Sequence, residues 1–363
     1  MKRILVYGMT SNMGGIETYL INIMNKMLPY NIIFDFVTDF PEIAYNDSLN
    51  KLGSKIFFIP SKKENLFGHL HGMWKLLNEH PEYHIVYFNL LTSTGSVTAL
   101  IPQLLHRKVI IHSHNSNADN KLVHDCFKPL IRLVSDYDVA CSKVAGIHMF
   151  GNRCLKDGKM LIVPNMIDFA KYDFNIERRN QLRKEWKLDS NYLVCHVGRM
   201  SEQKNPFKVI DIFEAVYKRE SSARLLYVGT GELEDEIKAY TKEKGIEENV
   251  FFLGLRNDVE DILQMADVFL LPSKYEGLVI AALEAQASGL PCFLSDTITT
   301  EGDITDNVTH IPLSTDSNVW AVAILNSRNL VRHSVFKEIA SSPYGLSNTN
   351  AAIDQLANIF INN

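Results

Sequence analysis

Short apolar runs and helical stretches alternate along almost the whole chain, and this alternation constrains the fold more than any other feature. The runs place β-branched and aromatic residues at consecutive positions, which is typical of strands buried on both faces. Segments long enough for a crossover helix separate them, so the pattern predicts an α/β fold with doubly wound parallel sheets. The expected strands are Arg3–Tyr7, Ile32–Val37, Lys55–Ile59, His84–Phe88, Val109–Ile111, Asp138–Ala140, Tyr192–Val197, Arg224–Val228, Val250–Leu253, Val268–Leu271 and Cys292–Leu294.

The alternation pauses between Val163 and Lys184, where proline, asparagine and charged residues replace the apolar runs. A chain of 363 residues suits two domains of about 150 residues or somewhat more. We therefore expect two Rossmann-like domains, residues 1–165 and residues 166–346. Apolar residues recur at helical spacing near the C-terminus, which predicts a final helix at about 347–363.

Composition favours a globular protein that stays in the cytoplasm. No run approaches the ~18 apolar residues of a membrane-spanning helix. Met1 is followed directly by the first expected strand rather than by a signal peptide. The five cysteines lack the spacing of metal ligands, which favours free thiols in a reducing compartment.

The net charge of −5 is unevenly distributed. Residues 1–165 hold 17 Lys and Arg against 13 Asp and Glu, whereas residues 166–363 hold 20 against 29. A basic first half suits an anionic partner, such as a phosphorylated acceptor or the anionic inner face of a membrane. Ordinary variation in surface charge is the alternative, because the chain has no long block of like charges.

Two carboxylates eight positions apart, Glu276 and Glu284, flank the expected start of a helix. Gly277 and the amides of Leu278, Val279 and Ile280 would form its N-terminus, where unsatisfied N–H groups and the helix dipole favour a phosphate. The carboxylates can accept hydrogen bonds from sugar or ribose hydroxyls. The pattern therefore indicates a nucleotide-sugar site, the alternative being a capping Glu276 and a solvated Glu284.

Two loops that follow strands are candidates for ligand contact, because open α/β sheets bind ligands at the carboxyl ends of their strands. Gly14 and Gly15 open a helix and let backbone amides approach a ligand, although a simple tight turn would use them too. Arg199 and Lys204 can converge on a diphosphate and neutralise the charge that grows as it leaves. Solvated surface cations are the alternative for this pair.

Taken together, these segments resemble the retaining glycosyltransferases of the GT-B fold, in particular the large family four of bacterial polysaccharide and lipid-sugar enzymes. The resemblance spans nearly the whole chain. It rests on Gly14-Gly15, His114, Pro164-Asn165, Gly198-Arg199 with Lys204, Gly229-Thr-Gly231, Phe252-Leu-Gly254, Pro272-Ser273, the Glu276/Glu284 pair and Ser288-Gly-Leu-Pro291. The chain departs from the family where Met166 replaces a glycine and where Leu278-Val279 replaces Phe-Gly.

The resemblance implies a role for each candidate residue. Arg199 and Lys204 would hold the donor diphosphate, Glu276 would bond the hydroxyls of the transferred sugar, and Glu284 would bond the ribose. The donor site would also include Gly14, Gly15, Leu255, Arg256, Gly277, Leu278 and Val279, with the Leu255-Arg256 backbone touching the base. The two domains would face a central cleft, with the acceptor on residues 1–165 and the final helix crossing back to them.

A histidine at the end of the strand 108–111 completes the implied site. In the family a histidine here lies near the reaction centre, and His114 is favoured because it stands farther into the loop, with His112 as the alternative. A satisfied structural histidine is the other interpretation of this position. We expect neither metal nor cofactor, because two cations with helix amides would replace Mg²⁺.

The expected activity is transfer of a hexose or N-acetylhexosamine from a nucleotide diphosphate, most simply UDP, to a sugar hydroxyl. The acceptor would be a lipid-linked glycan at the inner face of the membrane, and no nucleic acid is expected to bind. Two alternatives stay open. One is a UDP-sugar epimerase of the same fold, and the other is a non-catalytic subunit that binds a partner enzyme. Intact Arg199, Lys204 and Glu276 argue against the second.

Overall fold

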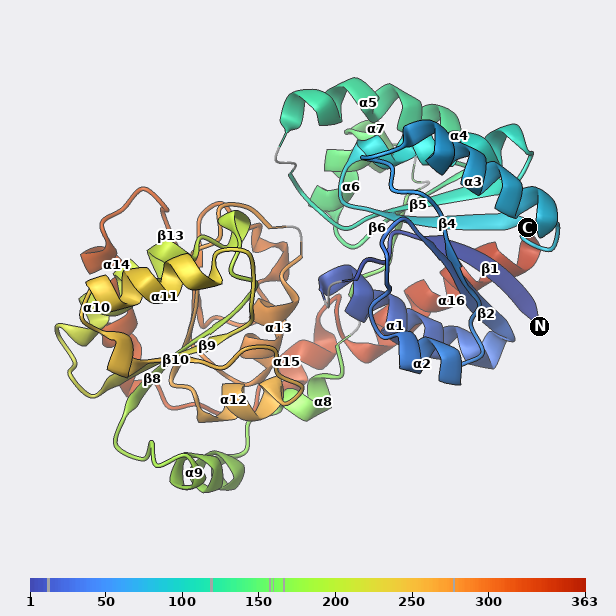
Figure 1. Cartoon of the computed structure of the whole chain (residues 1–363). Coiled ribbons are helices and arrows are strands. Elements are labelled where there is room, and N and C mark those ends of the chain that lie inside the picture. Colours follow the sequence, from blue (N-terminus) through green and yellow to red (C-terminus); the bar gives the residue numbers. More distant parts are fainter. Residues whose placement is uncertain (12–13, 118–119, 157, 159, 166, 277) are drawn as a thin grey trace. The chain divides into compact units, whose positions relative to one another are not determined.

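The computed structural model describes residues 1–11, 14–117, 120–156, 158, 160–165, 167–276 and 278–363 (Figure 1). The chain forms two compact units. Unit 1 comprises Met1–Met166 and Leu346–Asn363, and unit 2 comprises Ile167–Gly345.

Unit 1 is built on a seven-stranded parallel sheet with the strand order β3-β2-β1-β4-β5-β6-β7. Its strands are β1 (Lys2–Tyr7), β2 (Ile32–Thr38), β3 (Ile56–Phe58), β4 (Ile85–Leu90), β5 (Lys108–Ser113), β6 (Tyr137–Ala140) and β7 (Leu161–Ile162). Its helices are α1 (Gly15–Met27), α2 (Asn46–Lys51), α3 (Leu66–Glu79), α4 (Ser96–Leu104), α5 (Lys121–Val134), α6 (Lys143–Phe150), α7 (Arg153–Lys156) and α16 (Leu346–Asn362). The order reverses between β1 and β4, and ligands of doubly wound sheets bind at such a reversal.

The last helix of the chain completes the core of unit 1. Figure 1 shows α1 and α16 on the same side of the sheet. Phe360 of α16 is fully buried, and its ring lies 5.7 Å from that of Phe34 and 5.4 Å from that of Tyr87. Ile353 and Leu356 of the same helix belong to this core as well. Residues from both ends of the chain therefore stabilise one sheet.

Unit 2 is built on a six-stranded parallel sheet with the strand order β10-β9-β8-β11-β12-β13. Its strands are β8 (Tyr192–Val197), β9 (Ala223–Val228), β10 (Val250–Phe252), β11 (Val268–Leu271), β12 (Cys292–Ser295) and β13 (Val308–Ile311). Its helices are α8 (Phe169–Tyr172), α9 (Ile176–Glu185), α10 (Pro206–Tyr217), α11 (Glu234–Glu243), α12 (Val259–Met265), α13 (Ile280–Ala287), α14 (Ser317–Asn326) and α15 (Phe336–Ser341).

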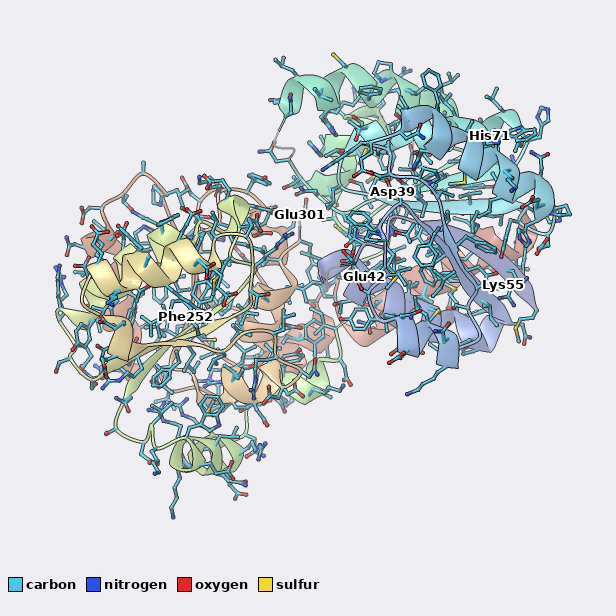
Figure 2. All side chains as sticks on the ribbon, in the orientation of Figure 1. Asp39, Glu42, Lys55, His71, Phe252 and Glu301 are labelled. Carbon is cyan, nitrogen blue, oxygen red and sulfur yellow. The ribbon has the colours of Figure 1, made fainter. Side chains whose placement is uncertain are left out.

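Successive residues of β8 point to opposite faces of the sheet and therefore pack in two different cores. Tyr192 and Val194 pack in the core that includes α10, and Leu193 and Cys195 pack in the core that includes α12. Phe252, labelled in Figure 2, belongs to the edge strand β10, and its ring lies 5.8 Å from that of Tyr227. Burial on both faces explains why the strands of this sheet have continuous apolar sequences.

Two parallel-sheet α/β units confirm the predicted fold class. The sequence pattern missed two edge strands, β7 and β13. Strand β7 has only two residues, and β13 is only partly buried, so neither shows a continuous apolar run. Among the described residues, no helix is long and apolar enough to cross a membrane.

Candidate functional site

Three turns that contain glycine pack together at the carboxyl edge of the unit 2 sheet. Gly198 follows β8, Gly229 follows β9 and Gly254 lies after β10. The N–H of Gly229 donates to the carbonyl of Gly254 at 2.8 Å. A Cβ on Gly229 would lie 2.2 Å from the Gly198 carbonyl oxygen, and φ at Gly229 is +129°. Only glycine permits this approach, so the turn that carries Arg199 depends on it.

Arg199 is accessible in this turn. Its side chain is 55% exposed, and its Nε lies 3.1 Å from Oε2 of Glu232, which is 53% exposed. An exposed ion pair contributes only about 0–1 kcal/mol, because water screens both charges. The guanidinium can therefore exchange Glu232 for another anion with little loss of stability.

Lys204 and Glu276 are in direct contact. Lys204 Nζ lies 2.6 Å from Glu276 Oε1, and the two side chains are 20% and 8% exposed. Lys204 ends the short 3₁₀ helix η3 (Glu202–Lys204), whereas Glu276 lies beyond β11. The Gln203 amide donates to Glu276 Oε2 at 3.4 Å and to the Tyr275 carbonyl at 3.0 Å. The structure thus joins the predicted phosphate cation to the predicted sugar carboxylate.

The helix that follows Glu276 begins later than the sequence predicts. Gly277 lies outside the described residues. Helix α13 starts at Ile280 and Val279 is its N-cap, with extended backbone at φ −84° and ψ 100°. The prediction that the Leu278 amide belongs to the helix start was therefore wrong. A β-branched residue favours extended backbone, and the unsatisfied amides are those of Val279 through Ala282.

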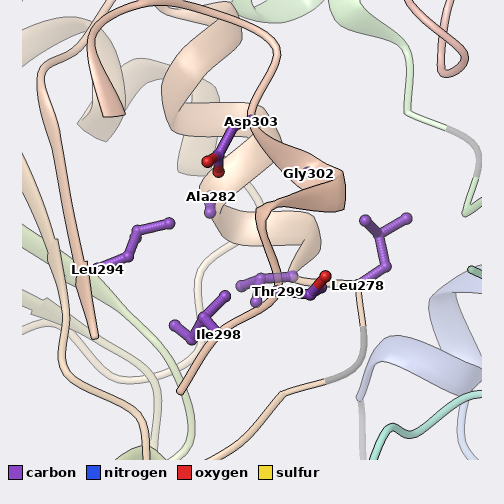
Figure 3. Close-up of a pocket in the computed structure, with 8 residues that line it drawn as sticks. Leu278, Ala282, Leu294, Ile298, Thr299, Gly302 and Asp303 are labelled. Carbon is purple, nitrogen blue, oxygen red and sulfur yellow. The ribbon is translucent and has the colours of Figure 1, made fainter. Parts of the chain in front are cut away.

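Leu278 and Val279 point their side chains into protein rather than into solvent. Both are 7% exposed, and both line a small pocket together with Ile298 and Thr299 (Figure 3). Apolar side chains dominate the lining, with Asp303 at one side. At these two positions only the backbone is suited to a polar ligand. Contact of Leu278 and Val279 with the donor remains a prediction.

Glu284 lies on α13 and is partly buried. Its Oε1 accepts a hydrogen bond of 2.8 Å from the Tyr172 hydroxyl. Burial raises the pKa of Glu284 to about 7, and the Tyr172 hydrogen bond opposes this effect. Glu284 is therefore not a solvated surface side chain, which was the alternative interpretation of this residue.

Leu255 and Arg256 follow the Gly254 turn and are exposed. Leu255 is 62% exposed. Arg256 Nε donates to Asp258 Oδ1 at 2.8 Å, and its guanidinium lies 5.9 Å from the centre of the Trp186 ring. Both side chains are accessible at the carboxyl edge of the sheet, and contact of the Leu255-Arg256 backbone with the base remains a prediction.

The two candidate histidines lie at the end of β5 in unit 1, with ring centres 4.0 Å apart. His112 is fully buried, and its Nδ1 lies 2.5 Å from the Tyr87 hydroxyl. His114 is partly exposed, and its Nε2 lies 2.9 Å from Asn89 Oδ1. Burial lowers the pKa of both, that of His114 to about 3, so both rings are neutral at pH 7. Of the two, His114 is the one a ligand can reach.

Gly14 and Gly15 open α1, with Gly14 as its N-cap in extended backbone. A Cβ on Gly14 would lie 2.9 Å from Glu17 Oε2. Glu17 is buried, and its Oε1 accepts from the Thr10 amide at 3.0 Å and from the Thr10 hydroxyl at 2.8 Å. The glycine thus leaves room for a carboxylate that braces the loop, and contact of this loop with the donor remains a prediction.

Comparisons with known proteins identify the family. The family described as "Glycosyl transferases group 1" matches residues 178–322, a range that holds Arg199, Lys204, Glu276 and Glu284. EpsF of Bacillus subtilis (strain 168), which is named as a glycosyltransferase, is 30% identical over 334 residues, 89% of this chain and 87% of that protein. The chain belongs to the group 1 glycosyltransferases.

Further relatives and solved structures extend the comparison. The UDP-Gal:alpha-D-GlcNAc-diphosphoundecaprenol alpha-1,3-galactosyltransferase of Escherichia coli is 27% identical over 258 residues, 67% of this glycosyltransferase and 66% of that protein. HepE of Anabaena in complex with UDP and glucose matches with a TM-score of 0.77 and 18% identity, covering 100% of both chains. WaaG, a glycosyltransferase involved in lipopolysaccharide biosynthesis, matches with a TM-score of 0.71 and 15% identity, over 99% of this chain and 100% of that one. These likenesses confirm the GT-B fold.

Sequence reasoning missed the residues that support the candidate groups of this glycosyltransferase. Gln203 donates to Glu276, Tyr172 donates to Glu284 and Asn89 contacts His114. Gln203 is adjacent to the candidate residue Lys204, and this position was a signal from which its role could have been predicted. Tyr172 and Asn89 lie far from their partners along the chain, so only the fold reveals them. Among the described residues, no group of three or more His, Cys, Asp or Glu is placed to hold a metal ion.

Proposed function

We propose that this glycosyltransferase is a retaining enzyme of family four that transfers a hexose or N-acetylhexosamine from a UDP-sugar to a sugar hydroxyl. The contact between Lys204 and Glu276 carries the proposal, because it joins a cation suited to diphosphate with a carboxylate suited to sugar hydroxyls. The accessible Arg199 guanidinium in the neighbouring turn adds a second charge for the diphosphate.

The names of similar proteins support the choice of substrate class. The E. coli relative is named for UDP-galactose and for an acceptor with a diphosphoundecaprenol group, and HepE was solved with UDP and glucose. On this basis we propose UDP as the donor nucleotide and a lipid-linked glycan as the acceptor.

Each candidate residue then has a stated task. Arg199 and Lys204 neutralise the leaving diphosphate, Glu276 holds the sugar hydroxyls, Glu284 holds the ribose, and His114 positions the sugar as a neutral hydrogen-bonding group. The bond between the sugar and the diphosphate oxygen breaks as the acceptor oxygen bonds to the same face of the anomeric carbon. The departing diphosphate oxygen takes the acceptor proton, and the anomeric configuration is retained.

We propose that transfer needs no metal ion, because two cations and the amides at the start of α13 supply the charge stabilisation that Mg²⁺ gives elsewhere. The epimerase alternative requires acid and base groups at the sugar and no second substrate. The non-catalytic alternative gives no reason for burying the Lys204–Glu276 contact.

One surface of unit 1 suits peripheral contact with an anionic membrane. On α5, Leu122 and Leu133 are 82% and 69% exposed, and Cys126 lies on the same helical face. Lys121, Asp125, Lys128 and Arg132 form the adjacent face of the helix, with three cations and one anion. An exposed apolar face beside a cationic face is typical of helices that lie in the interface of an anionic bilayer. We propose that α5 brings the enzyme to a lipid-linked acceptor.

The test uses the purified chain, a panel of UDP-sugars and a lipid-linked glycan acceptor, with and without excess EDTA. We expect transfer that survives EDTA and a product with the anomeric configuration of the donor, read by NMR. Glu276→Gln should depress turnover more than UDP affinity. Chelator-sensitive transfer would refute metal independence. Conversion of the UDP-sugar without acceptor would indicate the epimerase, and folded protein that binds no UDP-sugar would indicate the non-catalytic subunit.

A further inference from the structure

A tyrosine from the first helix of unit 2 holds the carboxylate proposed for the ribose. Tyr172 is the last residue of α8, and its hydroxyl donates to Glu284 Oε1 at 2.8 Å. Burial and the nearby carboxylates raise the pKa of Tyr172, so its hydroxyl keeps its proton and stays a donor. The contact joins two helices that are far apart in the sequence.

Gln264 restrains the backbone that carries the Tyr172 side chain. Gln264 of α12 is buried, and its amide donates to the carbonyls of Tyr172 and Asp173 at 3.3 and 2.8 Å. Its Oε1 accepts from the Asn175 amide at 3.0 Å. Gln264 thus holds the backbone at the end of α8, which sets where the Tyr172 ring can reach. A satisfied hydrogen-bond network of this kind rigidifies the groups that it joins.

The surroundings of Glu284 otherwise disfavour its charge. Burial, and to a smaller extent the charge of Glu260 on α12, raise its pKa to about 7. Asp168, which precedes α8, and Glu260 also act on Tyr172, so the charged groups around the pair are acidic. The Tyr172 hydrogen bond favours the ionised carboxyl.

We propose that Tyr172 is a positioning residue for nucleotide binding: its hydroxyl orients the Glu284 carboxyl and favours its ionised form, so that both ribose hydroxyls can donate to it. The inference rests on the ribose role proposed above for Glu284. An ionised carboxylate only accepts hydrogen bonds, whereas a protonated one loses part of that capacity.

As a consequence, UDP affinity should depend on pH, and Tyr172 should determine the pH range over which it changes. Below about pH 7 the Glu284 carboxyl is protonated in the free protein, and a ligand that needs the carboxylate binds less well. UDP affinity should therefore rise with pH through this range. Removal of the Tyr172 hydroxyl raises the pKa of Glu284 further, so the rise should move to higher pH.

The experiment measures UDP affinity by calorimetry at several values from pH 5.5 to 8.5. It compares the unchanged chain with Tyr172→Phe, Glu284→Gln and Tyr240→Phe. Tyr240 is a matched control because its hydroxyl also donates to a carboxylate at 2.8 Å, that of Asp211, away from the candidate residues. Ionisation of the UDP phosphate is common to all four proteins, so differences between their profiles report on the protein. Circular dichroism checks that each variant is folded.

We expect Tyr172→Phe to bind UDP about threefold to tenfold more weakly at pH 7, the range for one hydrogen bond, and to recover at pH 8.5. The Tyr240→Phe profile should match that of the unchanged chain. A loss in Tyr172→Phe that is equal at every pH, or no loss, would overturn the inference. If Glu284→Gln leaves UDP affinity unchanged, the ribose role itself fails, and the two failures are thereby distinguished.

Discussion

At the scale of single residues, mutation of Arg199 should affect UDP binding much more than it affects the stability of the fold. Its partner Glu232 is exposed, so Arg199→Ala should change the free energy of unfolding by less than about 0.5 kcal/mol. Loss of a charge-assisted hydrogen bond to the diphosphate should weaken UDP binding by about 1.5 to 3 kcal/mol.

Calorimetry with UDP and chemical denaturation of the same variant check this prediction. Glu232→Ala is the control: it removes the same ion pair and should leave UDP affinity equal or slightly higher. Unchanged affinity in folded Arg199→Ala protein would exclude Arg199 from the donor site.

His114 and His112 differ in a way that mutation can detect. His114→Ala should retain UDP binding and lose most of its turnover at saturating donor, since its ring is accessible and is proposed to position the sugar. His112→Ala should instead lower the stability of unit 1 by about 1 to 3 kcal/mol, because the Tyr87 hydroxyl loses a buried partner. Steady-state kinetics and thermal unfolding measure both effects. Near-normal turnover of His114→Ala would move the role elsewhere.

At the scale of secondary-structure elements, the packed turns of unit 2 depend on glycine to different degrees. A Cβ on Gly229 would strike the Gly198 carbonyl at 2.2 Å, whereas a Cβ on Gly245 meets nothing within 4 Å although its φ is also positive at +66°. Gly245→Ala should therefore show only the cost of left-handed backbone, about 1 to 2 kcal/mol. Gly229→Ala should cost more and should also weaken UDP binding, because the Arg199 turn must shift.

Denaturation and UDP calorimetry of the two alanine variants test this difference. Equal losses of stability, with equal UDP affinities, would show that the contact between the turns carries no function.

The exposed face of α5 gives a prediction at the same scale. Replacing Leu122 and Leu133 together by serine should abolish most cosedimentation with anionic vesicles and leave UDP affinity unchanged. Replacing the exposed Leu330 and Val331 of unit 2 by serine is the matched control and should preserve binding. Equal binding of all three proteins to vesicles would exclude α5 as the contact surface.

The secondary-structure elements could be predicted from the sequence more fully than the contacts that support the candidate residues. The strands Tyr192–Val197 and Val268–Leu271 have the bounds that the sequence indicates, because a continuous apolar run marks both of their ends. The start of α13 was misplaced, since Leu278 and Val279 satisfy a helical pattern but bury their side chains in the pocket. The pairing of Tyr172 with Glu284 has no local signal, because it depends on how α8 packs against α13.

At the scale of the whole molecule, buried neutral histidines make stability depend on pH. Burial lowers the pKa of His114 to about 3 and those of His148 and His196 to about 4. The unfolded chain takes up protons at these residues near pH 6.5 and the folded chain does not, so stability falls as pH decreases from 6.5 toward 4. The raised pKa of Glu284 acts in the opposite direction, and one carboxyl should not offset three histidines.

Thermal unfolding followed by circular dichroism at pH 7.5 and pH 5 tests this balance. The midpoint should be lower at pH 5, with each unit examined for a separate transition because two units need not unfold together. An equal or higher midpoint at pH 5 would contradict the prediction.

Helix α16 makes the maturation of unit 1 depend on residues that are synthesised after unit 2. Its side chains Ile353, Leu356 and Phe360 fill the core beneath β1 and β2, yet the ribosome adds all of unit 2 before them. Unit 2 is continuous and can complete its core while the nascent sheet of unit 1 still lacks part of its cover on the face that α1 also packs against. The half of this glycosyltransferase that is translated first should therefore be the half that finishes folding last.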